Sequence, residues 1–256
     1  RHGEKETATT TAETDLTDRG RKESAELGKR LDKKDAIKAY SSDTNRTKKS
    51  AELIVAASPT EKKMKHRIKK ELGFYYDKNG DFFNNLMKAK EEMLGRDFDE
   101  LQEEEKKERT EKYENWATNH YLSFNNQRLE TGTMSPLETA AMLAKRIETY
   151  AKMADKLYSG SDIQLVNDTH DFNLAAFLKE VLVRDVNGQK VRGFKNIEEI
   201  GGSLAFNEGF EILVENDKEG KKNIKLGFRG QQYELDERRL SDLVKIAEEA
   251  EKNIKK

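Results

Sequence analysis

Two short apolar stretches, each followed at once by a polar turn and a helix, constrain the fold of this chain more than any other feature. The first is "AIKAYSS" at 36–42, and the second is "DIQLVND" at 162–168. Both have the length and apolar content of buried strands. The segments that follow them, "DTNRTKKSAELIVAAS" and "THDFNLAAFLKEVLV", have the apolar spacing of helices. Strands that alternate with helices in this way predict an open α/β sheet with helices on both faces.

Capping residues and periodicity predict the other elements of the sheet layer. Thr17 can cap a helix over "LTDRGRKESAELGKRL". Ser135, Pro136 and Glu138 form a capping box at the start of "SPLETAAMLAKRIETYAKMADKLYSG". The C-terminal "ERRLSDLVKIAEEAEKNIKK" is an amphipathic helix, and "GSLAFNEGFEILVE" and "KNIKLGFRG" are predicted strands joined as a hairpin across "NDKEG".

The composition changes between residues 60 and 134. This segment is rich in Lys and Glu, has scattered aromatic residues, and includes the highly charged helix "DFDELQEEEKKERTEKYENW". A charged helix of this kind is typical of a solvated face. We therefore predict a mainly helical cap insertion at 60–134 in an α/β core formed by 1–59 and 135–256.

The composition limits the classes of partner. At 256 residues the chain is long enough for one large domain with an insertion, and its formal net charge is -1. Near-neutrality gives no reason to expect nucleic acid or a membrane surface as partner. The chain has no cysteine, which excludes disulfides and thiolate metal sites. Any attraction for an anion must therefore come from a local cluster of charges.

Three polar turns are predicted to meet at one edge of the sheet. They are Arg1-His2 in the opening "RHGEK", the turn at 42–46 and the turn at 169–171. In open α/β folds the site lies at the carboxyl ends of the strands. The turns together supply His2, His170, Arg1, Arg46 and Asp171.

These five residues are sufficient for phosphoryl transfer without a metal or cofactor. A neutral, oriented histidine can accept a phosphoryl group as nucleophile. Arginines match the oxygens of the group in transfer, and a carboxylic acid can protonate the leaving alkoxide. The set predicts transfer through phosphohistidine, with a small-molecule phosphomonoester as partner.

Four motifs in order resemble the histidine phosphatase superfamily. They are "RHGEK", "LTDRGRKESAELGKRL", "SSDTNRTKKSAELI" and "THDFNLAAFL". The pair His170-Asp171, followed by Asn173, is similar to the acid phosphatase and phytase branch, which is branch 2. The resemblance implies an α/β three-layer sandwich, with a central mixed, mostly parallel sheet flanked by helices. It also implies a helical cap, which 60–134 matches in position.

The resemblance also implies a role for each matching residue. His2 would be the nucleophile, and Asp171 would be the proton donor to the leaving group. Arg1, Arg46 and His170 would bind the phosphate. The implied activity is that of a metal-independent phosphomonoester hydrolase of the acid phosphatase type.

The chain departs from that branch after the glycine of the first motif. The branch has RHG-x-R-x-P, whereas this chain has Lys5 and Thr7 at the last two defined positions. Lys5 can still bind substrate, but as a point charge and not as a fork. Glu4 is like the mutase-type branch, in which the acid comes from elsewhere, for example from a Glu of the insertion. Two alternatives therefore stay open: a mutase or sugar-phosphate phosphatase of that other branch, and a non-catalytic phosphate-binding protein.

Further expectations concern the setting of the protein. The resemblance favours a secreted or periplasmic protein over a cytoplasmic one. In the family a central strand leads into the "RHG" motif, so we expect an apolar strand upstream of Arg1. The sequence does not identify the phosphomonoester or the oligomeric state.

Overall fold

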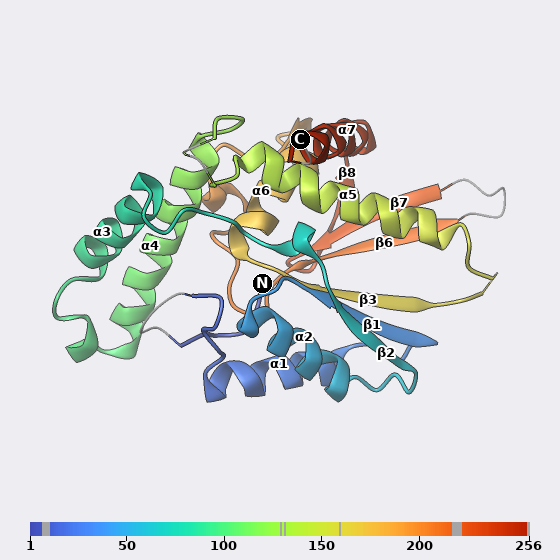
Figure 1. The fold of residues 1–256 in the computed structure, drawn as a ribbon, viewed down its shortest axis with the longest axis horizontal. Helices are drawn as coiled ribbons and strands as arrows, with labels where there is room; N and C mark the ends of the chain where they lie inside the picture. Colours follow the sequence, from blue (N-terminus) through green and yellow to red (C-terminus); the bar gives the residue numbers. More distant parts are fainter. Residues whose placement is uncertain (7–10, 129, 131, 159, 217–221, 255–256) are drawn as a thin grey trace.

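The computed structural model describes residues 1–256 except 7–10, 129, 131, 159, 217–221 and 255–256 (Figure 1). The helices are α1 (Asp18–Arg30), α2 (Asn45–Ala57), α3 (Asp81–Leu94), α4 (Glu103–Ser123), α5 (Pro136–Ala154), α6 (Asp171–Val181) and α7 (Glu237–Ile254). The strands are β1 (Ala36–Ser41), β2 (Lys63–Ile68), β3 (Ile163–Asp168), β4 (Leu182–Val186), β5 (Gln189–Arg192), β6 (Phe210–Asn216), β7 (Lys222–Phe228) and β8 (Gln231–Leu235). Short 3₁₀ turns lie at Lys70–Leu72, Phe98–Glu100 and Ile197–Ile200.

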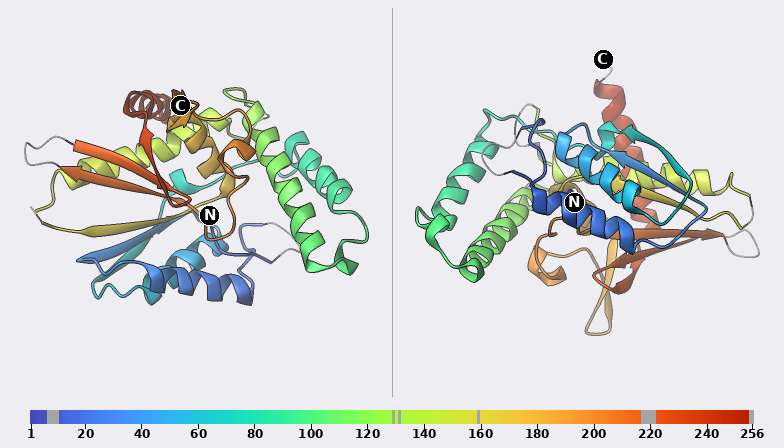
Figure 2. Two further views of the ribbon diagram at one scale, coloured as in Figure 1. Left: turned by 180° about the vertical axis from the view of Figure 1, so that it is seen from behind. Right: turned by 90° about the horizontal axis from the view of Figure 1, so that it is seen from below.

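The strands form two sheets. A parallel sheet has the order β2-β1-β3, and an antiparallel sheet has the order β5-β4-β8-β7-β6. The expectation of a single central mixed sheet is therefore wrong, because β3 and β6 are edge strands of separate sheets in the described part of the chain. The strands of both sheets converge toward the N-terminus (Figures 1 and 2).

Helices cover the parallel sheet on both faces, as expected for an α/β layer. The adjacent helices α1 and α2 lie on one side, and α5 crosses on the other, where it packs against α6 and α7 (Figure 1). The pair α3 and α4 stands apart at one end of the molecule. The apolar core runs through α5, α6 and α7 to the antiparallel sheet, and Phe177, Leu178, Leu226 and Leu243 are fully buried within it.

Several elements confirm the predictions. β1 and β3 lie within the two predicted strands, and α2 ends at Ala57, two residues before Pro59. The Thr17 side chain accepts a hydrogen bond from the N–H of Gly20, and Ser135 forms the predicted capping box. Such caps satisfy backbone N–H groups that the first helical turn leaves without partners.

Other elements were not predicted. The helix expected over "THDFNLAAFLKEVLV" ends at Val181, and the chain continues as β4 into a hairpin with β5. Asn187 and Gly188 form its turn with φ of 55° and 78°. A second such turn, Arg229-Gly230, joins β7 to β8. Positive φ at both positions is the geometry that matches the twist of a two-residue hairpin.

The predicted hairpin near the C-terminus is confirmed in part. β6 and β7 pair antiparallel from Phe210↔Phe228 to Asn216↔Lys222. The first strand begins at Phe210 and not at Gly202, so the preceding residues form a loop. Most of the turn "NDKEG" lies outside the described residues.

The segment 60–134 is helical over α3 and α4, but it begins with β2, which pairs in parallel with β1. β2 thus belongs to the parallel sheet, and the division into core and cap insertion stays a prediction. Across the described ranges, no helix combines the length and apolar character needed to cross a membrane.

Candidate active site

The opening residues lie against the carboxyl end of β3. The His2 N–H donates to the carbonyl of Thr169 (3.1 Å), and the His2 carbonyl accepts from the N–H of Asn207 (3.2 Å). A Cβ on Gly3 would come within 2.6 Å of Ser24 Oγ, so only glycine fits this close approach. Parallel pairing of β1 with β3 in register brings the two following turns to the same edge.

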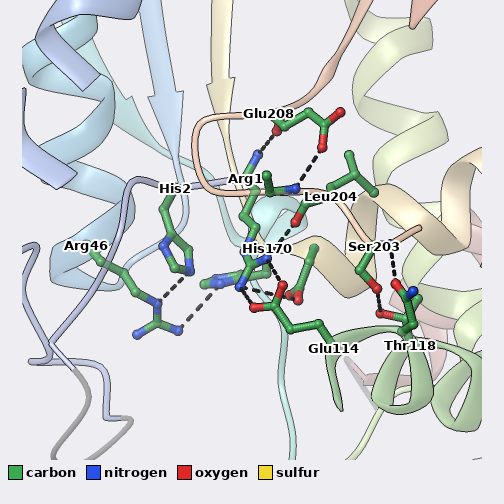
Figure 3. A network of polar contacts seen from close by, with 12 residues as sticks. Arg1, His2, Arg46, Glu114, Thr118, His170, Ser203, Leu204 and Glu208 are labelled. Atoms are coloured by element: carbon green, nitrogen blue, oxygen red, sulfur yellow. Dashed lines mark hydrogen bonds and ion pairs between the residues drawn. The ribbon is translucent and has the colours of Figure 1, made fainter. Parts of the chain in front are cut away.

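His2 is buried and fixed in orientation (Figure 3). Its Nδ1 lies 2.8 Å from the carbonyl oxygen of Gly3, which can only accept, so Nδ1 carries the proton. Its Nε2 accepts from Nε of Arg46 at 3.1 Å. Burial, with His170 and Arg46 close by, lowers the pKa of His2 well below its usual value. The ring is therefore neutral at pH 7, and the lone pair of Nε2 faces Arg46.

His170 lies beside His2 at the N-terminal end of α6. The two ring centroids are 5.5 Å apart, with an interplanar angle of 71°. Its Nε2 lies 3.2 Å from Ser42 Oγ, and its Nδ1 lies 3.5 Å from Nη2 of Arg46. Burial, and Arg46 next, lower its pKa well below the usual value.

Two cations from different turns face the histidines. Arg46, in the first turn of α2, is buried and also donates to the carbonyl of Thr11 at 2.8 Å. Lys5 follows the first motif and forms an isolated bridge with Leu16. Burial, and the positive charge of Arg46, lower the pKa of Lys5 to about 8. Like charges crowded into a buried pocket are stabilised by a bound anion.

Arg1 lies on the other side of His2. Its Nη1 donates to the carbonyl of Leu204 at 2.5 Å, and its guanidinium carbon lies 4.1 Å from the centroid of the Phe206 ring. Two carboxyl groups neutralise it, Glu114 and Asp171. Arg1 is thus held against the loop that precedes β6 (Figure 3).

The two carboxyl groups reach Arg1 from different elements. Asp171 begins α6, and its Oδ2 lies 3.8 Å from Nη2 of Arg1. Glu114 comes from the middle of α4 and forms a two-pronged pair with Arg1, at 2.8 Å and 3.2 Å. Sequence reasoning did not single out Glu114, because nothing distinguishes it among the many acidic residues of its helix.

The structure brings together all six residues expected to form the site: Arg1, His2, Lys5, Arg46, His170 and Asp171. Their roles stay predictions. Thr7, the other departure in the first motif, lies outside the described residues. Glu4 does not enter the pocket; its carboxylate accepts from Thr17 Oγ1 at 2.7 Å and so supports the start of α1. Within the described ranges, no cluster of three or more His, Asp or Glu side chains could hold a metal ion.

A family model described as the histidine phosphatase superfamily (branch 1) matches residues 1–73. No curated protein matches the chain. The solved structure "Mycobacterial hydrolase 1" overlays with a TM-score of 0.53 at 14% identity, covering 90% of this chain and 95% of that one, and so shows a shared fold.

Two other solved structures overlay with lower TM-scores. A mycobacterial glucosyl-3-phosphoglycerate phosphatase with inorganic phosphate has a TM-score of 0.48 at 12% identity, covering 87% of this chain and 91% of that chain. A phosphoglycerate mutase from Bacillus anthracis has a TM-score of 0.43 at 14% identity, covering 94% and 93%.

The assignment to the acid phosphatase and phytase branch is wrong. The matching family model is that of branch 1, and the match includes His2 and Arg46. The assignment to branch 2 gave most weight to the pair His170-Asp171. The residue Glu4, which extends the first motif to "RHGE", was the better guide to the branch. Over residues 1–73 the chain is similar to branch 1 of the histidine phosphatase superfamily.

Proposed function

We propose that this protein is a phosphoryl-transfer enzyme of the branch-1 histidine phosphatase type, which hydrolyses a small phosphomonoester through a phosphohistidine at His2. The observation that carries the proposal is the buried, neutral His2, held by Gly3 on one nitrogen and facing Arg46 with the other. A structural histidine does not need its lone pair to face a buried arginine beside a second histidine. The match of residues 1–73 to the branch-1 family supports the same chemistry.

The first step transfers the phosphoryl group to Nε2 of His2. A phosphate oxygen entering the pocket would replace Nε2 of His2 as the acceptor of the Arg46 N–H, which frees the lone pair for attack. Arg1, Lys5 and His170 would bind the other oxygens, where charge is spread in the transition state. Water then attacks the phosphohistidine, gives a proton to the carboxylate that protonated the leaving group, and releases inorganic phosphate.

The leaving oxygen needs a proton, and the pocket offers two carboxyl groups. The choice of Asp171 depended on the likeness to branch 2, which the family match contradicts. Glu114 lies outside the motifs and still reaches Arg1 at hydrogen-bond distance. We therefore assign proton donation to Glu114, which takes up a proton when the substrate phosphate replaces it on Arg1, and we assign the remaining ion pair with Arg1 to Asp171.

The test is hydrolysis of p-nitrophenyl phosphate with and without EDTA, together with rapid-quench trapping of phosphohistidine. We expect turnover that EDTA does not change, and a labelled histidine that is lost in His2→Ala. His66→Ala is the matched control, because His66 lies on the edge strand β2 and contacts Ser41 and not the pocket. Full activity in His2→Ala, or turnover that requires a metal, would sink the proposal.

A phosphomutase is the second candidate, because the same phosphohistidine can pass its group to a hydroxyl of a second molecule instead of water. The two activities differ in product. Transfer of label to an added sugar phosphate or hydroxy acid phosphate, with little release of inorganic phosphate, would indicate a mutase. Tight phosphate binding without phosphohistidine would indicate a binding protein.

A further inference from the structure

The backbone around His2 has almost every polar group paired. The His2 N–H and carbonyl bond to Thr169 and Asn207, and the Gly3 carbonyl accepts from the His2 ring. The one remaining donor is the N–H of Gly3. It donates to Oγ of Ser50 at 2.8 Å, from a serine on α2 that is fully buried.

Ser50 links this peptide to a buried carboxyl group. Having accepted from Gly3, the Ser50 hydroxyl still has its own proton to donate. It donates to the side chain of Asp168, the last residue of β3. A chain of hydrogen bonds thus runs from Asp168 through Ser50 to the N–H of Gly3, the residue whose carbonyl orients the His2 ring.

Asp168 is an unusual residue for its place. It is 3% exposed, and its Oδ1 is buried without a hydrogen-bond partner among the described residues. An apolar side chain would fit the end of a buried strand at lower cost, since burying a carboxyl group is unfavourable unless it is paired. No step of the proposed reaction uses this carboxyl group.

We propose that Asp168 is a positioning residue for His2, acting through Ser50 and the Gly3 peptide. This inference rests on the proposed function and deepens it. Asp168 touches neither the substrate nor the reacting atoms. It fixes the carbonyl that holds the proton on Nδ1 of His2, and so keeps Nε2 as the attacking atom.

The protonation of Asp168 adds a pH dependence to the same pocket. Burial raises its pKa to about 7, against the opposing effect of Arg46. Arg46 and the Ser50 hydroxyl face Asp168, and His2 and His170 nearby are neutral. Below pH 7 the carboxyl group is neutral, and above it a negative charge lies under the anion site. Anion binding therefore weakens as the pH rises through 7.

Two substitutions separate the two effects. Asp168→Asn keeps an acceptor for Ser50 and stays neutral at every pH, whereas Asp168→Val removes the acceptor. With p-nitrophenyl phosphate, we expect Asp168→Val to lower kcat about 10- to 100-fold at all pH values, since a small misplacement of a catalytic group has effects of this size. Asp168→Asn should keep kcat within about threefold of the parent, because its amide oxygen takes over the hydrogen bond.

The pH effect is measured with sulfate, which keeps its charge over this range. Sulfate affinity is titrated from pH 5.5 to 8.5 in the parent and in Asp168→Asn. The sulfate affinities of the two proteins should agree at pH 5.5. At pH 8.5 the parent should bind sulfate about tenfold more weakly, which corresponds to a coupling of one pKa unit between Asp168 and the bound anion.

Ser50→Ala should reproduce the kcat loss of Asp168→Val, and the double variant should be no worse than either single one. This cycle also keeps the inference testable if Asp168→Val fails to fold. Asp162→Asn is the matched control, because Asp162 lies just ahead of β3, exposed and paired with Lys34.

The two proposals fail in different ways. Unchanged kcat in both Asp168→Val and Ser50→Ala, or equal sulfate affinities at pH 8.5, would overturn the role of Asp168 while leaving an active parent enzyme. An inactive parent without phosphohistidine would overturn the proposed function instead. In that case the sulfate titration still tests Asp168 directly.

Discussion

Two regions of the molecule supply the side chains of the site, and they differ in how far the local sequence predicts where those side chains lie. Three turns, at 1–5, 42–46 and 169–171, supply the histidines, Arg46 and Lys5, and we refer to them as the strand-end turns. Helix α4 supplies one side chain, Glu114, from the middle of a 21-residue helix. The strand-end turns are fixed to the parallel sheet, whereas α4 lies with α3 at one end of the molecule (Figure 2) and packs against α6.

This difference shows what a local sequence pattern can and cannot reveal. A strand-end turn places its side chains through backbone geometry, so the strand pattern alone predicts where they go. Glu114 reaches Arg1 only because α4 packs at a particular angle against α6 and the 3₁₀ turn at Ile197–Ile200. That angle depends on contacts far apart in the chain, and no spacing within α4 encodes it.

The largest effect is expected in the strand-end turns, at Arg46. Arg46→Ala removes the guanidinium that faces both histidines, and should lower kcat/KM for p-nitrophenyl phosphate about 10⁴-fold, as for other arginines that stabilise a phosphoryl group in transfer. Arg46→Lys should recover only a small part, because an ammonium cannot match two phosphate oxygens. Arg19→Ala, on the exposed side of α1, is the control and should leave kcat/KM unchanged. A loss below tenfold in Arg46→Ala would show that the anion lies elsewhere.

The next prediction compares α4 with a strand-end turn directly. Glu114→Gln should lower kcat about 10³-fold on an alkyl phosphate, whose leaving group needs a proton. On p-nitrophenyl phosphate, which has a good leaving group, the loss should be much smaller. Asp171→Asn should affect the two substrates alike, because its role is to orient Arg1.

The reverse pattern is the informative alternative. If Asp171→Asn shows the leaving-group dependence and Glu114→Gln does not, the proton donor lies in the strand-end turns after all. Both variants preserve the size of the side chain, and Glu114→Gln keeps an oxygen that can accept from Arg1. Measured pH profiles of kcat for both substrates would show which carboxyl group titrates in the enzyme–substrate complex.

Much of the parallel layer could be predicted from sequence. β1, β3 and the helices that follow them match the expected elements, and both predicted N-terminal caps form. These elements have strong local signals: apolar strands of six residues, capping residues, and helices with one apolar side. The site residues followed from the same signals, because they lie in the turns between these elements.

The antiparallel layer was only partly predicted, although some of its signals were in the sequence. Asn187-Gly188 lies between "LVRDV" and "QKVR", which is a strong short-range hairpin pattern. The preceding helix has a continuous apolar run through Val181 and Leu182, and this run hid the boundary between α6 and β4. β2 had no such signal, because an exposed edge strand that contains three Lys or Arg residues lacks the apolar alternation of a buried one.

Lys5 should give a smaller and pH-dependent effect in the strand-end turns. Its pKa is lowered to about 8, so it is charged below pH 8 and loses its charge as the pH rises through 8. In the parent, kcat/KM should therefore fall above pH 8, because this ratio reports the free enzyme. Lys5→Arg should remove that fall. Lys5→Met should raise KM about tenfold at pH 7, which corresponds to a coupling of one pKa unit between Lys5 and the bound phosphate.

The profile of Lys5→Arg also separates Lys5 from Asp168. The step near pH 7, which we assign to Asp168, should remain in Lys5→Arg, and the step near pH 8 should disappear. An unchanged step near pH 8 would show that Lys5 does not face the anion. It would then be a lysine that only supports the bridge to Leu16.

The smallest expected effect is on the free energy of unfolding, and it compares the N-terminal starts of helices α5 and α4. Ser135 caps α5 through its side chain, whereas Gln102, at the same position of α4, makes no side-chain capping bond. Ser135→Ala should lower the free energy of unfolding by about 1 kcal/mol, and Gln102→Ala should leave it unchanged within about 0.3 kcal/mol. Urea unfolding at pH 7 measures both, with the m-value as the check that the unfolded states are comparable. Equal losses in the two variants would mean that the Gln102 side chain stabilises the start of α4 by a contact other than a capping bond, and that α4 is anchored more firmly than its helix start indicates. Because Glu114 must keep its distance to Arg1 during turnover, such anchoring would favour α4 over the first turn of α6 as the source of the proton.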